Sequence, residues 1–279
     1  MKKLFVTVFA ALAAVLAGAQ DINSATDYYN NAVSYYSAGD LVSALAQFQQ
    51  AYDIAKQCGE QGQDIVADCE TNIPILSIQI AKEAAKAGDY DLAVAKLQDA
   101  VGICKSVGAD DKAAEAQRLI PQFYLQQGNT ALKSKDYELA VSAFAKVLEI
   151  DPANGKAAVY QGQAYDRLGN SDAAEKAYLL AMENGQAKAA GKQLSKIYLK
   201  KASASNKAKD FATAVSQAKK SIEYNPENEQ AYYIAGLASQ NLKDNANAIV
   251  YFEKYLELAP SSANSQAVRE VVAALKKAK

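Results

Sequence analysis

The fold is decided by residues 128–152, which read GNTALKSKDYELAVSAFAKVLEIDP. Apolar residues follow Asp136 at helical spacing, for instance Leu139, Phe144 and Val147. Sustained alternation of apolar and polar residues, the mark of a half-buried strand, is absent. The stretch therefore predicts two helices joined by a turn at Asp136, whose side chain would cap the second helix.

The same hairpin pattern recurs along the chain. An Ala follows each turn, four residues after an Asp or Asn, and the pairs are Asp40/Ala44, Asp89/Ala93, Asp136/Ala140, Asn170/Ala174, Asp210/Ala214 and Asp244/Ala248. A small residue lies twelve positions before each Ala and a mostly bulky one four positions after it: Ala32/Phe48, Ala81/Leu97, Gly128/Phe144, Gly162/Tyr178, Ala202/Ala218 and Gly236/Phe252. Small residues let two helices approach closely, and the bulky residue fills the remaining gap. Such hairpins bury their apolar faces only by stacking, so an all-α solenoid is expected.

These positions resemble the tetratricopeptide repeat, whose signature places Gly, Tyr, Ala and Phe at set offsets before a closing Pro. The best-matching hairpins carry Gly162, Tyr165, Ala174 and Tyr178; Tyr124, Gly128, Ala140, Phe144 and Pro152; and Tyr232, Gly236, Ala248, Phe252 and Pro260. Two other hairpins lack the Tyr of the turn, with Ala84 and Ser205 in its place. The resemblance implies an α-solenoid of about six such hairpins with a C-terminal capping helix.

The predicted organisation follows from these registers. We expect a signal peptide at 1–19, a solenoid at 20–260 and a capping helix at 261–279. The repeats are placed at about 24–57, 74–107, 121–154, 155–188, 195–228 and 229–260. The intervening stretches 57–74 and 105–121, and a shorter one near 186–191, are expected to add helical turns. Pro74 and Pro121 would either start the next helix or kink a longer one.

The first residues are typical of an export signal. Lys2 and Lys3 precede an apolar run, and Ala17-Gly18-Ala19 fits a small-x-small cleavage site, so cleavage after Ala19 is expected. The apolar run is short for a membrane span, which needs about 20 residues. The mature chain is therefore expected outside the cytoplasm, in the periplasm or secreted, with no transmembrane anchor after cleavage. In that compartment one disulfide among Cys58, Cys69 and Cys104 is possible, as are buried thiols.

Composition excludes several function classes. The 279 residues contain no His, which rules out a His-based triad or imidazole zinc site, and no cofactor or metal is expected. A net charge of -1 argues against a general nucleic-acid binder. Ser195 and Lys196 are adjacent on a predicted helix and would not face each other, so a Ser-Lys dyad is not expected. We predict that the protein is not an enzyme.

The resemblance implies a binding groove lined by the first helix of each hairpin. Its candidate residues are Tyr29, Val33, Tyr36, Leu125, Asn129, Leu132, Val159, Gln163, Asp166, Leu199, Asn206, Tyr233, Leu237 and Gln240. Tyr29 and Tyr233 fit groove and core equally well, whereas Leu125 and Val159 fit the core better. The slots that capture a terminal carboxylate in some tetratricopeptide domains are mostly occupied by apolar residues here. Five basic residues could give the groove a positive stripe or simply be solvated, namely Lys82, Lys86, Lys133, Arg167 and Lys207.

The sequence therefore predicts a non-catalytic scaffold or adaptor. Its groove would bind a partner protein or an extended peptide, and nothing in the sequence identifies that partner. The alternatives are a self-assembling structural protein of the cell envelope and, with less support, a binding module or enzyme associated with the cell wall.

Overall fold

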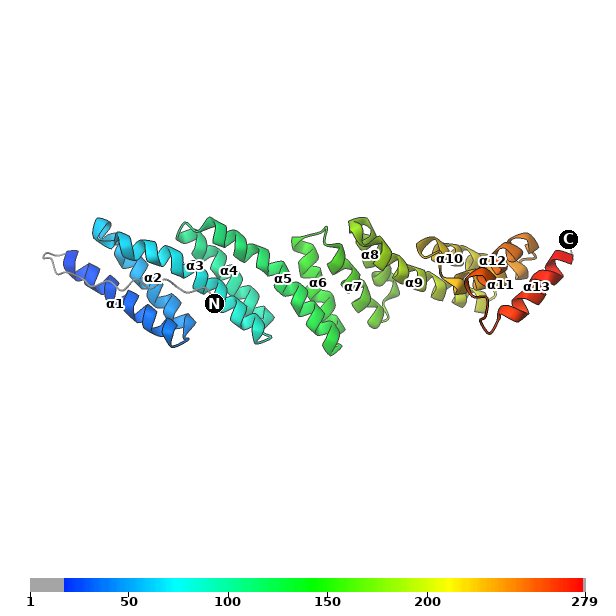
Figure 1. Cartoon of the computed structure of the whole chain (residues 1–279), viewed down its shortest axis with the longest axis horizontal. Helices are drawn as coiled ribbons and strands as arrows, with labels where there is room; N and C mark the ends of the chain where they lie inside the picture. The colour runs from blue at the N-terminus through cyan, green and yellow to red at the C-terminus, as the bar shows by residue number, and fades with distance from the viewer. Residues whose placement is uncertain (1–17, 278–279) are drawn as a thin grey trace. The chain divides into compact units, whose positions relative to one another are not determined.

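The structure, a computed structural model, describes residues 18–277, and these residues form helices joined by turns, without a strand among them (Figure 1). The successive helix pairs are α1 (Gly18–Ser37) and α2 (Leu41–Gln57); α3 (Gln63–Lys86) and α4 (Tyr90–Ser106); α5 (Asp110–Ser134) and α6 (Tyr137–Ile150); α7 (Gly155–Arg167) and α8 (Ser171–Ala181); α9 (Ala187–Lys207) and α10 (Phe211–Tyr224); α11 (Glu229–Asn241) and α12 (Asn245–Leu258). A last helix, α13, covers Ser265–Lys277. The predicted fold class, an all-α solenoid of helix hairpins with a capping helix, is confirmed.

The chain forms two compact units, one ending at Gln127 and the other starting at Gly128, within α5. In the first unit, Phe48, Ile73 and Leu76 belong to one buried cluster and Leu97 to another. In the second unit, buried clusters form around Tyr178 and Phe252. Each unit therefore has its own apolar core.

Each hairpin turn has the same construction. A carboxylate or amide oxygen accepts a hydrogen bond from the backbone N–H three residues on, as predicted, in the pairs Asp40–Ser43, Asp89–Leu92, Asp136–Leu139, Asn170–Ala173, Asp210–Thr213 and Asp244–Asn247. The residue just before each of these caps has a left-handed backbone: Gly39, Gly88, Lys135, Gly169, Lys209 and Lys243. This conformation ends the first helix within a few residues of the second.

The predicted pairing of small and bulky residues is also confirmed. A Cβ added at Gly128, Gly162 or Gly236 would come within 2.6 Å of the ring on the second helix of its hairpin. Those rings belong to Phe144, Tyr178 and Phe252, which are fully buried. In these three hairpins, only a glycine lets the two helices pack this closely.

The long stretches between repeats add helical turns, as expected. They lengthen α3 and α5, which contain Pro74 and Pro121 in their interiors rather than at their starts. A short 3₁₀-helix, Gly59–Gly62, links α2 to α3. Between α8 and α9 lies a kinked segment, Met182–Gln186, in which Gly185 has φ of 81°. The first helices thus differ in length, from 13 residues in α7 to 25 in α5.

The last helix closes the second unit. Val268 and Val272 of α13 are buried in a cluster with Phe252 and Tyr255 of α12. Lys276 forms an ion pair with Glu253 at 2.6 Å, and Arg269 and Glu270 are exposed. One side of α13 is therefore apolar and covered, and the other is polar.

The expected signal peptide, residues 1–19, lies outside the described residues except for Gly18 and Ala19 in the first turn of α1. Among the helices that the structure describes, none combines the length and apolarity needed to cross a membrane.

Candidate functional site

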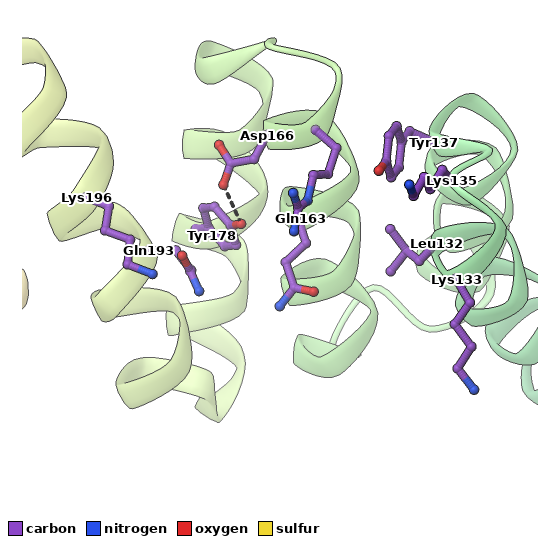
Figure 2. Close-up of a pocket in the computed structure, with 10 residues that line it drawn as sticks. Leu132, Lys133, Lys135, Tyr137, Gln163, Asp166, Tyr178, Gln193 and Lys196 are labelled. Atoms are coloured by element: carbon purple, nitrogen blue, oxygen red, sulfur yellow. Dashed lines mark hydrogen bonds between the residues drawn. The ribbon is translucent and has the colours of Figure 1, made fainter.

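The second unit contains an open cavity of about 680 Å³. Three successive first helices, α5, α7 and α9, contribute to its lining, together with residues at the starts or middles of second helices. The lining residues are Leu132, Lys133, Lys135, Tyr137, Gln163, Asp166, Arg167, Tyr178, Gln193 and Lys196. Figure 2 shows Gln163 in the middle, with Lys135 and Tyr137 on one side and Gln193 and Lys196 on the other.

A hydrogen bond from a buried tyrosine holds the acidic residue of this cavity, which is itself exposed. The Tyr178 hydroxyl donates to Oδ2 of Asp166 at 2.7 Å (Figure 2). Tyr178 is fully buried, and its ring packs where Gly162 leaves room. Burial, and then the neighbouring Asp166, raise the pKa of Tyr178 far above its usual range. The tyrosine therefore stays protonated and remains a donor to Asp166.

The cavity carries an excess of positive charge. Its basic side chains are Lys133, Lys135, Arg167 and Lys196, and Asp166 is its single acidic residue. Lys135 lies in the left-handed turn between α5 and α6, with φ of 66°. Such a conformation is unfavourable for a residue with a side chain. This turn places the basic side chain of Lys135 at the start of α6, next to Tyr137 (Figure 2).

Three of the residues predicted for the groove, Leu132, Gln163 and Asp166, do line this cavity. Two others are buried in the core, Tyr29 with 5% and Val159 with 7% of its surface exposed. The Tyr29 hydroxyl donates to Asp68 at 3.0 Å, and its ring meets Phe48 edge to face. These two side chains therefore present very little surface to a partner in this structure.

The remaining predicted residues are partly buried. Tyr233 packs on Tyr255 with ring centroids 5.2 Å apart, and Val33, Tyr36 and Leu237 border apolar clusters. Asn206 Oδ1 is buried without a hydrogen-bond partner among the described residues. The others, Leu125, Asn129, Leu199 and Gln240, are also half-exposed. None of these residues lines the cavity of the second unit.

Two lining residues, Lys133 and Arg167, were predicted only as part of a possible positive stripe, and five more were not predicted for the groove at all, namely Lys135, Tyr137, Tyr178, Gln193 and Lys196. Tyr178 stood out in the sequence only as a packing residue. Lys196 was considered with Ser195, and the structure separates the two: Ser195 is buried and donates to the Ser221 carbonyl oxygen at 2.8 Å, whereas Lys196 is exposed. The two adjacent side chains therefore lie in different environments.

The cysteines form no intramolecular disulfide in the structure. Cys69 and Cys104 are buried free thiols. Burial raises the pKa of the Cys69 thiol to about 12 and also raises that of Cys104. Cys58 Sγ donates to the Ile54 carbonyl oxygen at 3.4 Å. Of the two possibilities left open by the sequence, the structure has buried thiols at Cys69 and Cys104.

Two parts of the chain match sequence models of the tetratricopeptide repeat, residues 125–191 and 229–262. These segments are tetratricopeptide repeats, and they cover the hairpins that carry most of the signature residues. A search of curated proteins found no match.

Several solved structures resemble the chain. The MamA protein, known from a crystal structure, is 20% identical in sequence to this chain. The match covers 68% of this chain and 94% of the MamA chain, with a TM-score of 0.39. YrrB, described as a tetratricopeptide-repeat protein with an unusual peptide-binding site, is 18% identical over 70% of this chain and 91% of its own, with a TM-score of 0.38. MamA from Desulfovibrio magneticus RS-1 is 18% identical over 68% and 97%, with a TM-score of 0.36. Similarities this low carry no information about function.

Proposed function

We propose that this chain is a non-catalytic scaffold that binds an extended segment of a partner protein. The observation that carries the proposal is the cavity of the second unit, which three consecutive first helices line together. An extended segment can cross several helices, and Gln163 and Gln193 offer amide donors and acceptors for its backbone. The matches to the tetratricopeptide repeat in the same region support this use.

Two buried serines of the second unit, Ser195 and Ser221, are engaged in packing rather than exposed to a substrate. Ser195 and Ser221 exchange hydrogen bonds with each other's backbone carbonyls at 2.8 Å, and Asn228 donates to Ser195 at 2.8 Å. Within the described residues no group of His, Cys, Asp and Glu is placed to hold a metal ion. The proposal therefore assigns binding, and not chemistry, to the second unit.

We also propose that the protein works outside the cytoplasm, on the strength of residues 1–19 alone. The test is the amino-terminal sequence of the protein recovered from its native host. Export with cleavage after Ala19 gives Gln20 as the first residue, whereas a retained Met1 contradicts it.

Site-directed photocrosslinking tests the binding role. A photoreactive phenylalanine analogue replaces Gln163 in the cavity, and a matched variant carries it at Lys176, an exposed residue on α8. We expect a discrete protein adduct from position 163 and none from position 176. Adducts that consist only of this chain would instead favour the self-assembling alternative. The polar outer side of α13 argues for an array that ends there, because a stacking surface would be apolar.

A further inference from the structure

We propose that the cavity of the second unit binds an acidic segment of the partner, through Asp and Glu side chains rather than through a terminal carboxylate. This inference rests on the proposed scaffold function and adds the chemistry of the ligand. Three observations carry it: the cavity has an excess of positive charge, its basic side chains form no ion pairs among the described residues, and these side chains come from three repeats.

The four basic side chains of the cavity are available for a ligand. None of Lys133, Lys135, Arg167 and Lys196 takes part in an ion pair among the described residues. Several lysines elsewhere are neutralised within their own helix, as in Lys146–Glu149 and Lys254–Glu257, at 2.9 and 2.6 Å. Lys201 pairs with Glu175 of the preceding repeat at 2.6 Å. The cavity therefore gathers cations that the chain itself does not balance.

The one carboxylate in the cavity is already partly engaged. Asp166 accepts the Tyr178 hydrogen bond through Oδ2, which limits its ability to turn toward the lysines. Asp166 is thus a negative charge in a fixed position among the basic side chains of the cavity, and it opposes the binding of an acidic ligand. Removing this charge is consequently expected to strengthen such binding.

The positions of the cations favour an extended ligand. Lys133 and Lys135 belong to the end of α5 and its turn, Arg167 to the end of α7, and Lys196 to α9. Carboxylates on successive residues of one segment can meet them in turn, whereas a single terminal carboxylate engages only one place. Leu132 and Tyr137 add apolar contact area beside the charges.

A protein ligand fits these observations better than a nucleic acid. The whole chain has a net charge of -1, so it lacks the basic excess with which a protein neutralises the phosphates of a long nucleic acid. A peptide with acidic residues only in a short stretch needs no more than the local cations of the cavity. Nucleic acid is retained as an outcome of the test.

The probe is a fluorescent peptide of alternating Glu and Ser, acetylated and amidated so that it has no charged ends. Binding is measured by fluorescence anisotropy on residues 20–279, with Gln/Ser and Lys/Ser peptides of the same length. We expect binding of the Glu/Ser peptide only, weakened by salt because exposed charges are screened. The double variant Lys133→Glu and Lys196→Glu should bind about tenfold more weakly or worse, because two attractions to the peptide's carboxylates become repulsions.

Two further variants make the result specific. Asp166→Asn keeps an oxygen for the Tyr178 hydrogen bond and removes the charge, so it should bind the Glu/Ser peptide several-fold more tightly. Lys176→Glu reverses one charge, as each substitution of the double variant does, at an exposed position of α8 that does not line the cavity, and it should leave binding within about twofold. Circular dichroism checks that each variant is folded.

An unbiased library of displayed peptides separates this inference from the proposed function. Enrichment of acidic sequences that lose binding in the double variant supports both. Enrichment of basic or apolar sequences that crosslink at position 163 overturns the acidic ligand and leaves the scaffold standing. Failure of every peptide to bind contradicts both, and stronger competition by a single-stranded oligonucleotide than by a peptide of equal charge overturns the protein ligand.

Discussion

The buried hydroxyl of Tyr178 on α8 donates a hydrogen bond to Asp166 on α7 over 2.7 Å. The same tyrosine ring fills the space left by Gly162, and the same aspartate lines the cavity. One side chain thus connects the packing of a hairpin to its binding surface. Changes at Tyr178 should accordingly separate the two roles.

Replacing Tyr178→Phe should lower the free energy of unfolding by about 1 kcal/mol, the usual net value of a hydrogen bond whose acceptor can turn to water. The phenyl ring keeps the contact with Gly162, so the helical circular dichroism should not change. Urea unfolding measures the difference. Tyr165→Phe, on the same hairpin, is the control and should shift the free energy by less than about 0.5 kcal/mol. Equal losses in the two variants would show that the hydrogen bond to Asp166 contributes nothing particular.

Gly162→Ala should destabilise the second unit, although alanine favours helices. The new Cβ would lie 2.6 Å from the Tyr178 ring, and such overpacking costs about 1–3 kcal/mol. This loss exceeds the gain of about 1 kcal/mol in helix propensity. In Gly102→Ala, on α4, the new Cβ would have no heavy atom within 4 Å, so this variant shows the gain in helix propensity alone.

Thermal unfolding of the two alanine variants is the measurement. We expect the midpoint to fall for Gly162→Ala and to rise for Gly102→Ala. A rise in both would mean that the helices of the α7–α8 hairpin can separate at little cost.

The turns and the small–bulky pairs were predictable because they depend on residues close in sequence. Asp136 caps the helix that starts one residue later, and Gly162 faces Tyr178 within one hairpin. Helical periodicity and capping chemistry suffice to place such residues. The fold therefore followed from patterns that lie within one helix pair, about 34 residues in the tetratricopeptide repeat.

The groove was predicted less well because it depends on how neighbouring repeats stack. Tyr29 fitted groove and core equally well in the sequence, and the long α3 places it in the core by bringing Asp68 against its hydroxyl. Val159, for which the core was favoured, is buried in a cluster with Leu194 of the following repeat. Lys135 and Lys196 come to one cavity from different repeats, and no sequence spacing relates them.

The left-handed lysines of the turns predict a stabilising substitution. Lys209 has φ of 64°, a conformation that costs a residue with a Cβ about 1–2 kcal/mol. Lys209→Gly removes that cost but makes the unfolded chain more flexible, so a net gain of about 0.5–1 kcal/mol is expected. Lys200→Gly, at an exposed position inside α9, should instead lose about 1 kcal/mol.

Chemical unfolding of these two glycine variants should therefore give shifts of opposite sign. Lys135 is left unchanged in this comparison because it also lines the cavity. A loss of stability in Lys209→Gly would show that the lysine side chain contributes more to the turn than its backbone costs.

The capping aspartates predict how stability depends on acid pH. Hydrogen bonds from the residue three positions on lower the pKa of Asp40, Asp210 and Asp244 below the ordinary value of 3.8. A carboxylate with a lowered folded-state pKa stabilises the fold fully above 3.8 and loses this contribution as the pH falls through the folded-state pKa. The midpoint of thermal unfolding should accordingly fall as the pH is lowered from about 5 to about 2. Asp210→Asn keeps an oxygen acceptor for Thr213 without a titrating group, so its midpoint should fall less steeply over this range. A variant as acid-sensitive as the parent chain would assign the acid sensitivity to other carboxylates.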